Sequence, residues 1–295
     1  MKKNKNIWSE KLTQKAVEFT HPDIMAKMIA TIDSNGDPHI TMITSNKAVN
    51  PSTVKWGEFT YGTSKKNVLA NSKQGILFMT AEMPFKFIQI KADFNYCSTE
   101  AEDAADFNQT DLFRYNVYMR VYKTYFNKVK EASSIRDIPL FGIVKGIIRN
   151  LFGKRKHRTG KIENRLPKFG TKLYNGLVFP KFIAYLDPKD GYPIIIPCFQ
   201  ARSIENKKII FPLSQFKDDL LKIPENSKVA VFVMDFETET MLVKGTYLGI
   251  TNSRGVIEIE QVYNSMPPQP GMIYPKLEVK EKVISFPKEI NKKEK

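Results

Sequence analysis

Cysteine is nearly absent from this sequence of 295 residues, since only Cys97 and Cys198 occur and neither belongs to a CxxC pair. Two isolated cysteines so far apart predict neither the disulfide framework of a small secreted protein nor a cysteine-based zinc site. Histidine is also scarce. The three present, His21, His39 and His157, show no spacing typical of a metal site or of a nucleophile with its base. We therefore expect no metal, and a reducing, cytoplasmic location.

Long apolar runs are missing as well. No stretch approaches the roughly 18 uninterrupted apolar residues that a membrane-spanning helix needs. The lysine-rich start, Met1 to Lys5, is not followed by the apolar core of a signal peptide. With 42% hydrophobic and 12% aromatic residues, the chain still has enough apolar material for a sizeable core. These features predict an unexported globular protein with two domains or one large one.

Negative charge is under-represented. The chain has 46 lysine and arginine residues against 31 aspartate and glutamate residues, a formal net charge of +15. Such an excess attracts anions, whether a phosphorylated cofactor, an acidic lipid surface or nucleic acid. Charge alone does not choose among these partners. Because no recognition motif for nucleic acid accompanies the charge, we expect no specific nucleic-acid partner.

One segment of the sequence occurs twice. Residues 29–38 read IATIDSNGDP and residues 183–193 read IAYLDPKDGYP, so each has an apolar strand, a turn with Asp and Gly, and a proline before a second apolar run. This pattern is typical of a β-hairpin. Further apolar strands follow both copies at similar distances, at residues 75–80 and 87–92 in the first and at 229–234 and 241–246 in the second. The sequence thus predicts two copies of one small barrel.

The stretch between the copies changes its period. Apolar residues recur at three- and four-residue spacing from Thr99 to Lys130, which predicts an amphipathic helix. A second predicted helix, within residues 138–158, has a broad apolar face and ends in the basic run Lys154 to Arg158. A basic amphipathic helix can lie on an anionic membrane surface. Alternatively, its apolar face packs on a barrel or covers a site while its basic end stays solvated.

The first copy also carries a more specific motif. Its hairpin ends in Pro38-His39, and about twenty residues later comes the run FTYGTSKKNVLAN at residues 59–71. Together they resemble the pyridoxamine 5'-phosphate oxidase-like, FMN-binding split-barrel superfamily, well over residues 24–96 and more weakly over 180–250. The resemblance implies FMN as cofactor, with Phe59 and Thr60 beside it and with Ser64, Lys65 and Lys66 at its phosphate.

The phosphate site also follows from elementary chemistry. A phosphate dianion favours fixed cations, a hydroxyl and the backbone amides at a helix start, and residues 62–66, Gly-Thr-Ser-Lys-Lys, offer all three. The resemblance further implies that the strand after the hairpin runs along the flavin, with Thr41, Met42, Ile43 and Thr44 as candidate contacts. Alternatively, these residues only alternate between the two faces of a barrel strand. The oxidase itself has basic residues where this chain has Thr41 and Asn46, which argues against oxidation of pyridoxamine phosphate.

Together, the repeat and the resemblance predict a mostly β (α+β) fold: two tandem split β-barrels that form a pseudo-dimer, with a helical insertion between them. The expected segments are a flavin-binding module at 1–98, a basic helical insertion at 99–175, a degenerate second module at 176–275 and a basic tail at 276–295. The second module keeps Ser214 but lacks the glycine and the lysine pair, so we expect no phosphate site there. The family usually binds flavin between two subunits, and a covalent tandem can build that interface within one chain. The chain is then a monomeric pseudo-dimer or a homodimer.

These features favour an FMN-dependent oxidoreductase acting on a small molecule, in which the flavin does the redox chemistry and the protein positions it. The alternative is a non-enzymatic protein that carries flavin, or that has exchanged it for haem, for which only His21 and His39 are candidate ligands. A third hypothesis is weak contact with an anionic membrane surface through residues 138–158. The sequence names no catalytic residue, substrate or electron donor.

Overall fold

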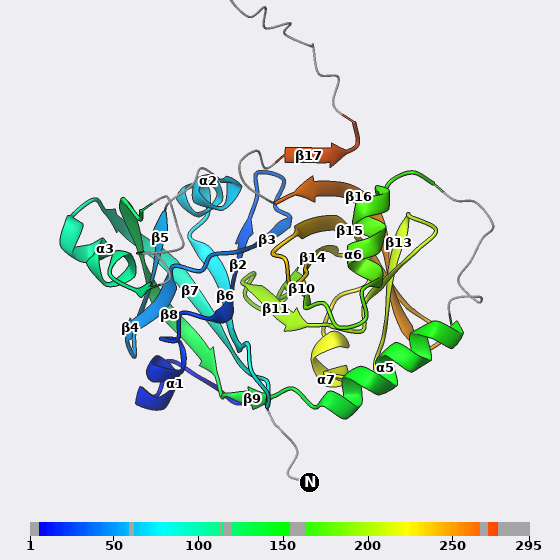
Figure 1. The fold of residues 1–295 in the computed structure, drawn as a ribbon, viewed down its shortest axis with the longest axis horizontal. Coiled ribbons are helices and arrows are strands. Elements are labelled where there is room, and N and C mark those ends of the chain that lie inside the picture. Colours follow the sequence, from blue (N-terminus) through cyan, green and yellow to red (C-terminus); the bar gives the residue numbers. More distant parts are fainter. Residues whose placement is uncertain are drawn as a thin grey trace, which may run out of the picture.

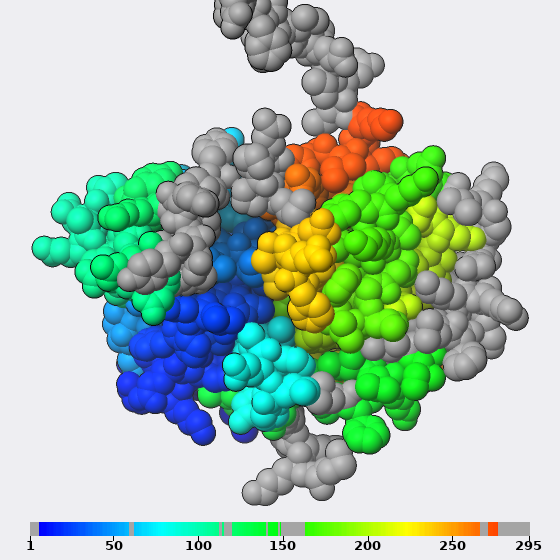
Figure 2. All heavy atoms as spheres, viewed as in Figure 1, coloured from blue at the N-terminus to red at the C-terminus, as the bar shows by residue number. Residues whose placement is uncertain are grey.

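Two antiparallel sheets, one from each half of the sequence, lie side by side in this protein (Figure 1). In Figure 2 the two halves of the chain lie next to each other on the face in view. The structure is a computed structural model that describes residues 6–58, 62–111, 114, 120–153, 163–265 and 271–276. The predicted mostly β fold is confirmed.

The first sheet has the strand order β3-β2-β6-β7-β8-β5-β4, with β1 paired to β8 and β9 paired to β7. Helix α1 (Gln14–Phe19) precedes β2, α2 (Thr63–Ala70) follows β5, and α3 (Ala101–Asn108) follows β7. The strands are β1 (Trp8–Ser9), β2 (Met25–Ile32), β3 (Pro38–Met42), β4 (Asn46–Asn50), β5 (Thr53–Glu58), β6 (Lys73–Thr80), β7 (Lys86–Ser98), β8 (Lys123–Ser133) and β9 (Arg136–Asp137).

The second sheet repeats this arrangement in the order β11-β10-β14-β15-β16-β13-β12, with β17 paired to β16. Helix α6 (Lys168–Asn175) precedes β10, and α7 (Lys217–Leu220) follows β13. The strands are β10 (Lys181–Leu186), β11 (Pro193–Pro197), β12 (Arg202–Ile204), β13 (Lys208–Pro212), β14 (Lys228–Met234), β15 (Thr240–Thr251), β16 (Arg254–Asn264) and β17 (Gly271–Tyr274). The chain is therefore a tandem of two split β-barrels, with helix α5 (Leu140–Gly153) in the connection between them.

The repeated hairpins form for the same local reason. Asp33 Oδ1 accepts hydrogen bonds from the backbone N–H groups of Asn35 (2.8 Å) and Asp37 (3.0 Å), which folds the chain back after β2. In the second copy Asp187 Oδ1 accepts from the N–H of Lys189 at 3.0 Å. An aspartate that bonds to the backbone two residues on is a common way to start a tight turn. The hairpin signal seen in the sequence thus has a physical basis in both modules.

The helix predicted from Thr99 to Lys130 is wrong at its end, from Lys123 to Lys130. Residues 112, 113 and 115–119 of the prediction lie outside the described residues. Helix α3 ends at Asn108, and β8 is a strand that lies between β7 and β5. Tyr125 of β8 stacks on Trp56 of β5, with ring centroids 4.0 Å apart. The pairing of β7 with β8 contains register shifts. Such irregularities break the strict alternation of a strand, so the apolar residues can show a spacing similar to that of a helix.

The predicted module boundaries change as a consequence. A first module ending at residue 98 leaves out β8 and β9, which both belong to the first sheet. The predicted insertion, which runs to residue 175, includes α6, but Leu173 and Tyr174 of that helix are buried in the core of the second barrel. The connection between the modules is therefore shorter than the sequence pattern indicated. No helix within the described ranges is long and apolar enough to cross a membrane.

The two modules meet through equivalent strands. β3 contacts β10, β14 and β15, and β11 makes the matching contacts with β2, β6 and β7. A buried apolar cluster between the sheets takes Met28, Ile40 and Leu77 from the first module and Phe182 and Phe232 from the second. Because the same strands serve on both sides, this contact has the form of an isologous dimer interface within a single chain.

Two ion pairs repeat the same symmetry. Lys91 Nζ lies 2.9 Å from Asp187 Oδ2 in the second module, and Lys244 Nζ pairs with Asp33 Oδ2 in the first. The two lysines occupy matching positions, since Lys91 lies opposite Gly75 in the sheet and Lys244 lies opposite Ala230. Each module thus inserts its hairpin aspartate next to a lysine of the other.

The close approach of the modules makes a prediction at Gly75. A Cβ at this position would clash with the backbone carbonyl of Pro193 in the other module. Gly75→Ala should therefore force the modules apart and lower the free energy of unfolding by about 2 kcal/mol, as overpacking does in well-packed cores. Chemical denaturation measures the change. Gly271→Ala, where a Cβ meets nothing within 4 Å, is the control, and an equal loss in both variants would contradict this explanation.

Candidate functional site

The predicted phosphate residues come together at the start of α2. Gly62 is the N-cap of this helix and makes no side-chain cap, so the first amides of the helix are available to an anion. Ser64 is buried, Lys65 is mostly buried and Lys66 is exposed. Phe59 and Thr60, the other two residues of the motif, lie outside the described residues.

The far end of α2 is fixed to the first barrel. Val68 is buried in the barrel core, and Asn67 Nδ2 donates a hydrogen bond to Thr31 Oγ1 at 2.9 Å. The helix also contacts both β2 and β3. The start of the helix is thereby held beside the strand that was predicted to run along the flavin, as Figure 1 shows at the upper side of the first module.

A carboxylate stands behind the predicted phosphate site. Lys65 Nζ lies 3.4 Å from Glu58 Oε1, and Tyr125 donates a hydrogen bond to Glu58 Oε2 at 2.8 Å. Burial lowers the pKa of Lys65, while the charge of Glu58 acts in the opposite direction. Glu58 thus orients Lys65 and also competes with any phosphate for its charge.

The second module contributes to the same place through Tyr263 of β16. Its hydroxyl lies 3.2 Å from Thr63 Oγ1 at the first position of α2, and its ring meets that of His39 edge to face with centroids 5.6 Å apart. Burial, together with the charge of Lys244, lowers the pKa of His39 to about 3. His39 is therefore neutral at physiological pH and lies against a side chain from the other barrel.

The four candidate contacts of the predicted ring strand divide between two faces. Met42 packs against the apolar cluster between the modules, whereas Ile43 is buried in the core of the first barrel. The backbone N–H of Ile43 donates to the carbonyl of Lys27 at 2.9 Å. Thr41 and Thr44 are half-buried. The structure thus brings Met42 to the junction of the modules and turns the side chain of Ile43 away from it.

The equivalent place in the second module is built differently. Helix α7 follows β13 as α2 follows β5, but its first turn carries Asp218 and Asp219 in place of a lysine pair. Arg136 of the first module reaches Asp219 at 2.7 Å, and both side chains are buried. The start of α7 therefore already holds an ion pair with its own carboxylate.

Helix α5 covers the segment that precedes α7 in the second module. Ser214 Oγ donates to the carbonyl of Gly142 at 3.2 Å, and Gln215 Nε2 donates to the carbonyl of Pro139 at 3.3 Å. Gly146 approaches Ser214 and Gln200 so closely that a Cβ would displace them. The side of α5 that carries Gly142 and Gly146 thus packs on the second barrel, as one of the two hypotheses for this helix predicted. The basic run Lys154 to Arg158 lies outside the described residues.

The two candidate haem ligands and one group of carboxylates make contacts within the protein. His21 Nε2 lies 3.0 Å from the carbonyl oxygen of Ala48, and His39 is enclosed as described above. Asp235, Glu237 and Glu239 come close together. In this group Asp235 Oδ1 accepts hydrogen bonds from the backbone N–H groups of Glu237 (2.9 Å) and Glu239 (2.8 Å), as in a turn.

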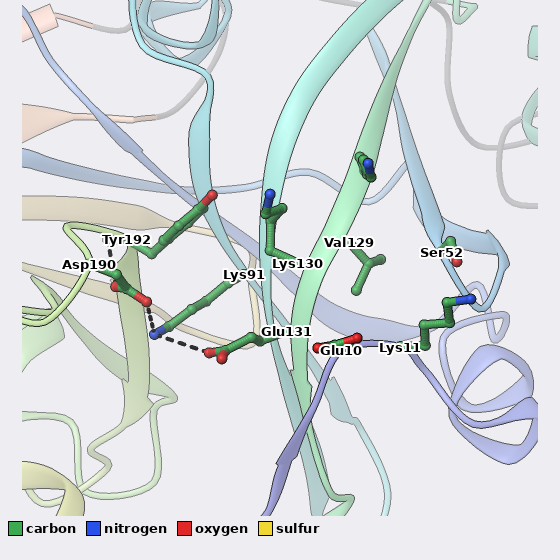
Figure 3. Close-up of a pocket in the computed structure, with 10 residues that line it drawn as sticks. Glu10, Lys11, Ser52, Lys91, Val129, Lys130, Glu131, Asp190 and Tyr192 are labelled. Carbon is green, nitrogen blue, oxygen red and sulfur yellow. Dashed lines mark hydrogen bonds and ion pairs between the residues drawn. The ribbon is translucent and has the colours of Figure 1, made fainter.

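A cavity of about 450 Å³ lies at another part of the junction (Figure 3). Lys91 projects into it and pairs with Asp190 (2.7 Å) and Glu131 (3.4 Å). Burial acts to lower the pKa of Lys91, but its bonds to Asp190 and Asp187 raise that pKa overall. The charge of this lysine is therefore paired within the protein. Lys11, Lys128 and Lys130 also line the cavity, together with Glu10.

Sequence reasoning missed Glu58 and Tyr263. Glu58 directly precedes the motif, but a single glutamate at a strand end carries no signal of its own. Tyr263 lies 200 residues from Thr63 in the sequence, and only the packing of the two modules brings them together. Comparing the two repeats shows that β16 corresponds to β8, but this correspondence does not indicate that Tyr263 lies near Thr63.

Comparisons with known proteins match only part of the chain. No protein-family model matches the sequence, and no curated protein matches it. Among solved structures, an FMN-binding protein from Syntrophomonas wolfei subsp. wolfei is 13% identical with a TM-score of 0.36, and the match covers 41% of this chain and 84% of that protein. HupZ of Group A Streptococcus is 23% identical with a TM-score of 0.33, covering 40% and 89% respectively. An FAD-binding protein from Mesorhizobium loti is 8% identical with a TM-score of 0.31, covering 43% and 99%. The fold given above rests on strand order and register.

Proposed function

We propose that this protein binds FMN at the start of α2, at the junction of its two modules, and acts as an FMN-dependent oxidoreductase on a small molecule. One observation carries the proposal. The N-terminus of α2 has Ser64, Lys65 and Lys66 in its first turn and lies beside Tyr263 of the second module, and it offers a phosphate cations, a hydroxyl and amide donors.

The roles of the residues follow from their positions. The amides and side chains of Ser64, Lys65 and Lys66 would hold the phosphate, and Met42 and Tyr263 would border the ring from the two modules. Bound FMN supplies hydride or electron transfer. Neutral His39 is fixed against Tyr263, so it can orient this side chain without adding a charge beside the flavin.

The difference between the two modules supports a single site. In the second module the first turn of α7 is acidic, and α5 lies over Ser214 and Gln215. An anion there would meet the carboxylates of Asp218 and Asp219, and the buried Asp219 already holds the nearby cation Arg136. We therefore propose about one FMN per chain, on the helix that keeps its anion site.

Glu58 offers a sharp test of the phosphate position. Glu58→Gln removes the carboxylate that competes for Lys65 and keeps a hydrogen-bond acceptor for Tyr125. FMN affinity should rise about five-fold, equivalent to roughly 1 kcal/mol of relieved charge competition. Riboflavin, which lacks the phosphate, is the matched ligand, and titration by flavin fluorescence measures both. An equal gain for riboflavin would show that Glu58 does not act on the phosphate.

The enzymatic part of the proposal needs a separate experiment. FMN-loaded protein is mixed anaerobically with reduced nicotinamide cofactors, and the visible absorbance of the flavin is followed. Bleaching faster than that of free FMN, and return of the colour with a small-molecule acceptor, would support an oxidoreductase. Bound flavin that reacts no faster than free FMN would favour the carrier hypothesis.

A further inference from the structure

Helix α5 exposes apolar side chains along one side. Phe141 is 92% exposed, Val144 is 54% exposed and Ile148 is 48% exposed. At 100° per residue, these three positions fall on one side of an α-helix. We call them the outer face of α5. Figure 1 shows the helix along the lower edge of the second module, away from α2.

The opposite side of the helix already has its partner. Ile143 is buried in the cluster between the modules, and Gly142 and Gly146 lie against the segment from Gln200 to Gln215. The small glycines let the helix backbone approach the second barrel closely. Packing on the barrel therefore accounts for one side of α5 and leaves the apolar side chains of the outer face in water.

The segment of sequence that contains the outer face is basic. Lys145, which lies between Val144 and Ile148 in the sequence, is exposed. From residue 138 to residue 162 the sequence holds lysine or arginine at 145, 149, 154, 155, 156, 158 and 161, and it has no aspartate or glutamate. Asp137, which is exposed, and Glu163 bound this basic segment. An apolar strip within a basic segment is typical of a helix that lies in the headgroup region of an anionic bilayer.

We propose that the outer face of α5 docks this protein on an anionic membrane surface, with Phe141, Val144 and Ile148 entering the interface and Lys145 facing the headgroups. The main alternative occupant is a second copy of the chain. An isologous contact through the same face would bring Lys145 of the two copies near each other, and residues 138–162 offer no carboxylate to pair with it. The charge pattern therefore favours anionic lipid.

Co-sedimentation with vesicles tests the proposal. The full chain is mixed with vesicles of phosphatidylcholine alone and of phosphatidylcholine with phosphatidylglycerol, at low and high salt. We expect binding to the mixed vesicles only, weakened by salt because the attraction is partly electrostatic. The variant with Phe141→Ser, Val144→Ser and Ile148→Ser should bind about ten-fold more weakly, because it loses the apolar part of the contact.

Phe236→Ser is the matched control, since Phe236 is 73% exposed and belongs to the β14–β15 hairpin and not to α5. It should bind vesicles as the unchanged protein does. Thermal melting checks that both variants fold, and a folded triple variant that binds undiminished would overturn the proposal. So would equal binding to neutral vesicles, or a dimer in lipid-free sedimentation that the triple variant abolishes. FMN affinity should be the same in all these proteins, so the outcome is independent of the flavin site.

Discussion

Replacing Lys65 and Lys66 together with alanine should weaken FMN binding by about 100-fold or more. Each lysine is expected to form a charge-assisted contact with the phosphate, and such contacts contribute about 1.5–3 kcal/mol each. Lys65 is the more rigidly placed of the two, because Glu58 and burial confine it. Isothermal titration with FMN measures the loss.

Two controls make this result specific. Riboflavin affinity should change little in the double variant, since riboflavin has no phosphate to lose. Lys217→Ala removes a lysine from the start of α7, the equivalent helix of the second module, and should leave FMN affinity as it was. If FMN affinity survives the loss of both Lys65 and Lys66, the phosphate does not bind at α2.

Replacing Arg136 with methionine should lower the free energy of unfolding by about 3 kcal/mol or more. Arg136 Nη1 lies 2.7 Å from Asp219 Oδ2, and its guanidinium lies over the rings of Phe87 (5.2 Å) and Phe216 (5.1 Å). Both charged side chains are over 90% buried. Removing one partner of a buried pair leaves the other charge uncompensated, which is the costly case.

A double-variant comparison separates the ion pair from packing. Asp219→Asn added to Arg136→Met should recover part of the loss, because no uncompensated carboxylate is then left buried. Lys222→Met is the matched control. Lys222 also pairs with Asp219, at 3.7 Å, but its side chain is 59% exposed, and such a pair contributes at most about 1 kcal/mol. Urea denaturation measures all three variants, and a loss at Arg136 no larger than at Lys222 would contradict the role given to this pair.

The sequence was most informative where the signal is local. The hairpins after Asp33 and Asp187 depend on residues within four positions of each aspartate, so the repeat and its strands could be predicted. The lysine pair of α2 could also be found, because a helix start and its cations are neighbours in the chain. Local chemistry therefore predicted both the fold class and one half of the candidate site.

The sequence was least informative where strands pair over long distances. The apolar spacing of β8 imitates a helix, and only its pairing with β5 and β7 makes it a strand. The roles of Tyr263 and Arg136 depend on how one module packs on the other, which no window of sequence contains. The glycines of α5 also could not be interpreted from the sequence. They interrupt the apolar pattern, and their role in close packing depends on contacts with the second barrel.

The central claim is that one of the two repeated modules keeps a flavin phosphate site. Its most direct test is to incubate the full chain with excess FMN, remove free ligand by gel filtration, release the bound flavin by heat and count it per chain. We expect about one FMN per chain because, of the two equivalent helices α2 and α7, α2 has a lysine pair in its first turn and α7 has two aspartates there. Two FMN per chain would contradict the assignment of the second module as closed, and a chain that retains no FMN would contradict the proposed function itself.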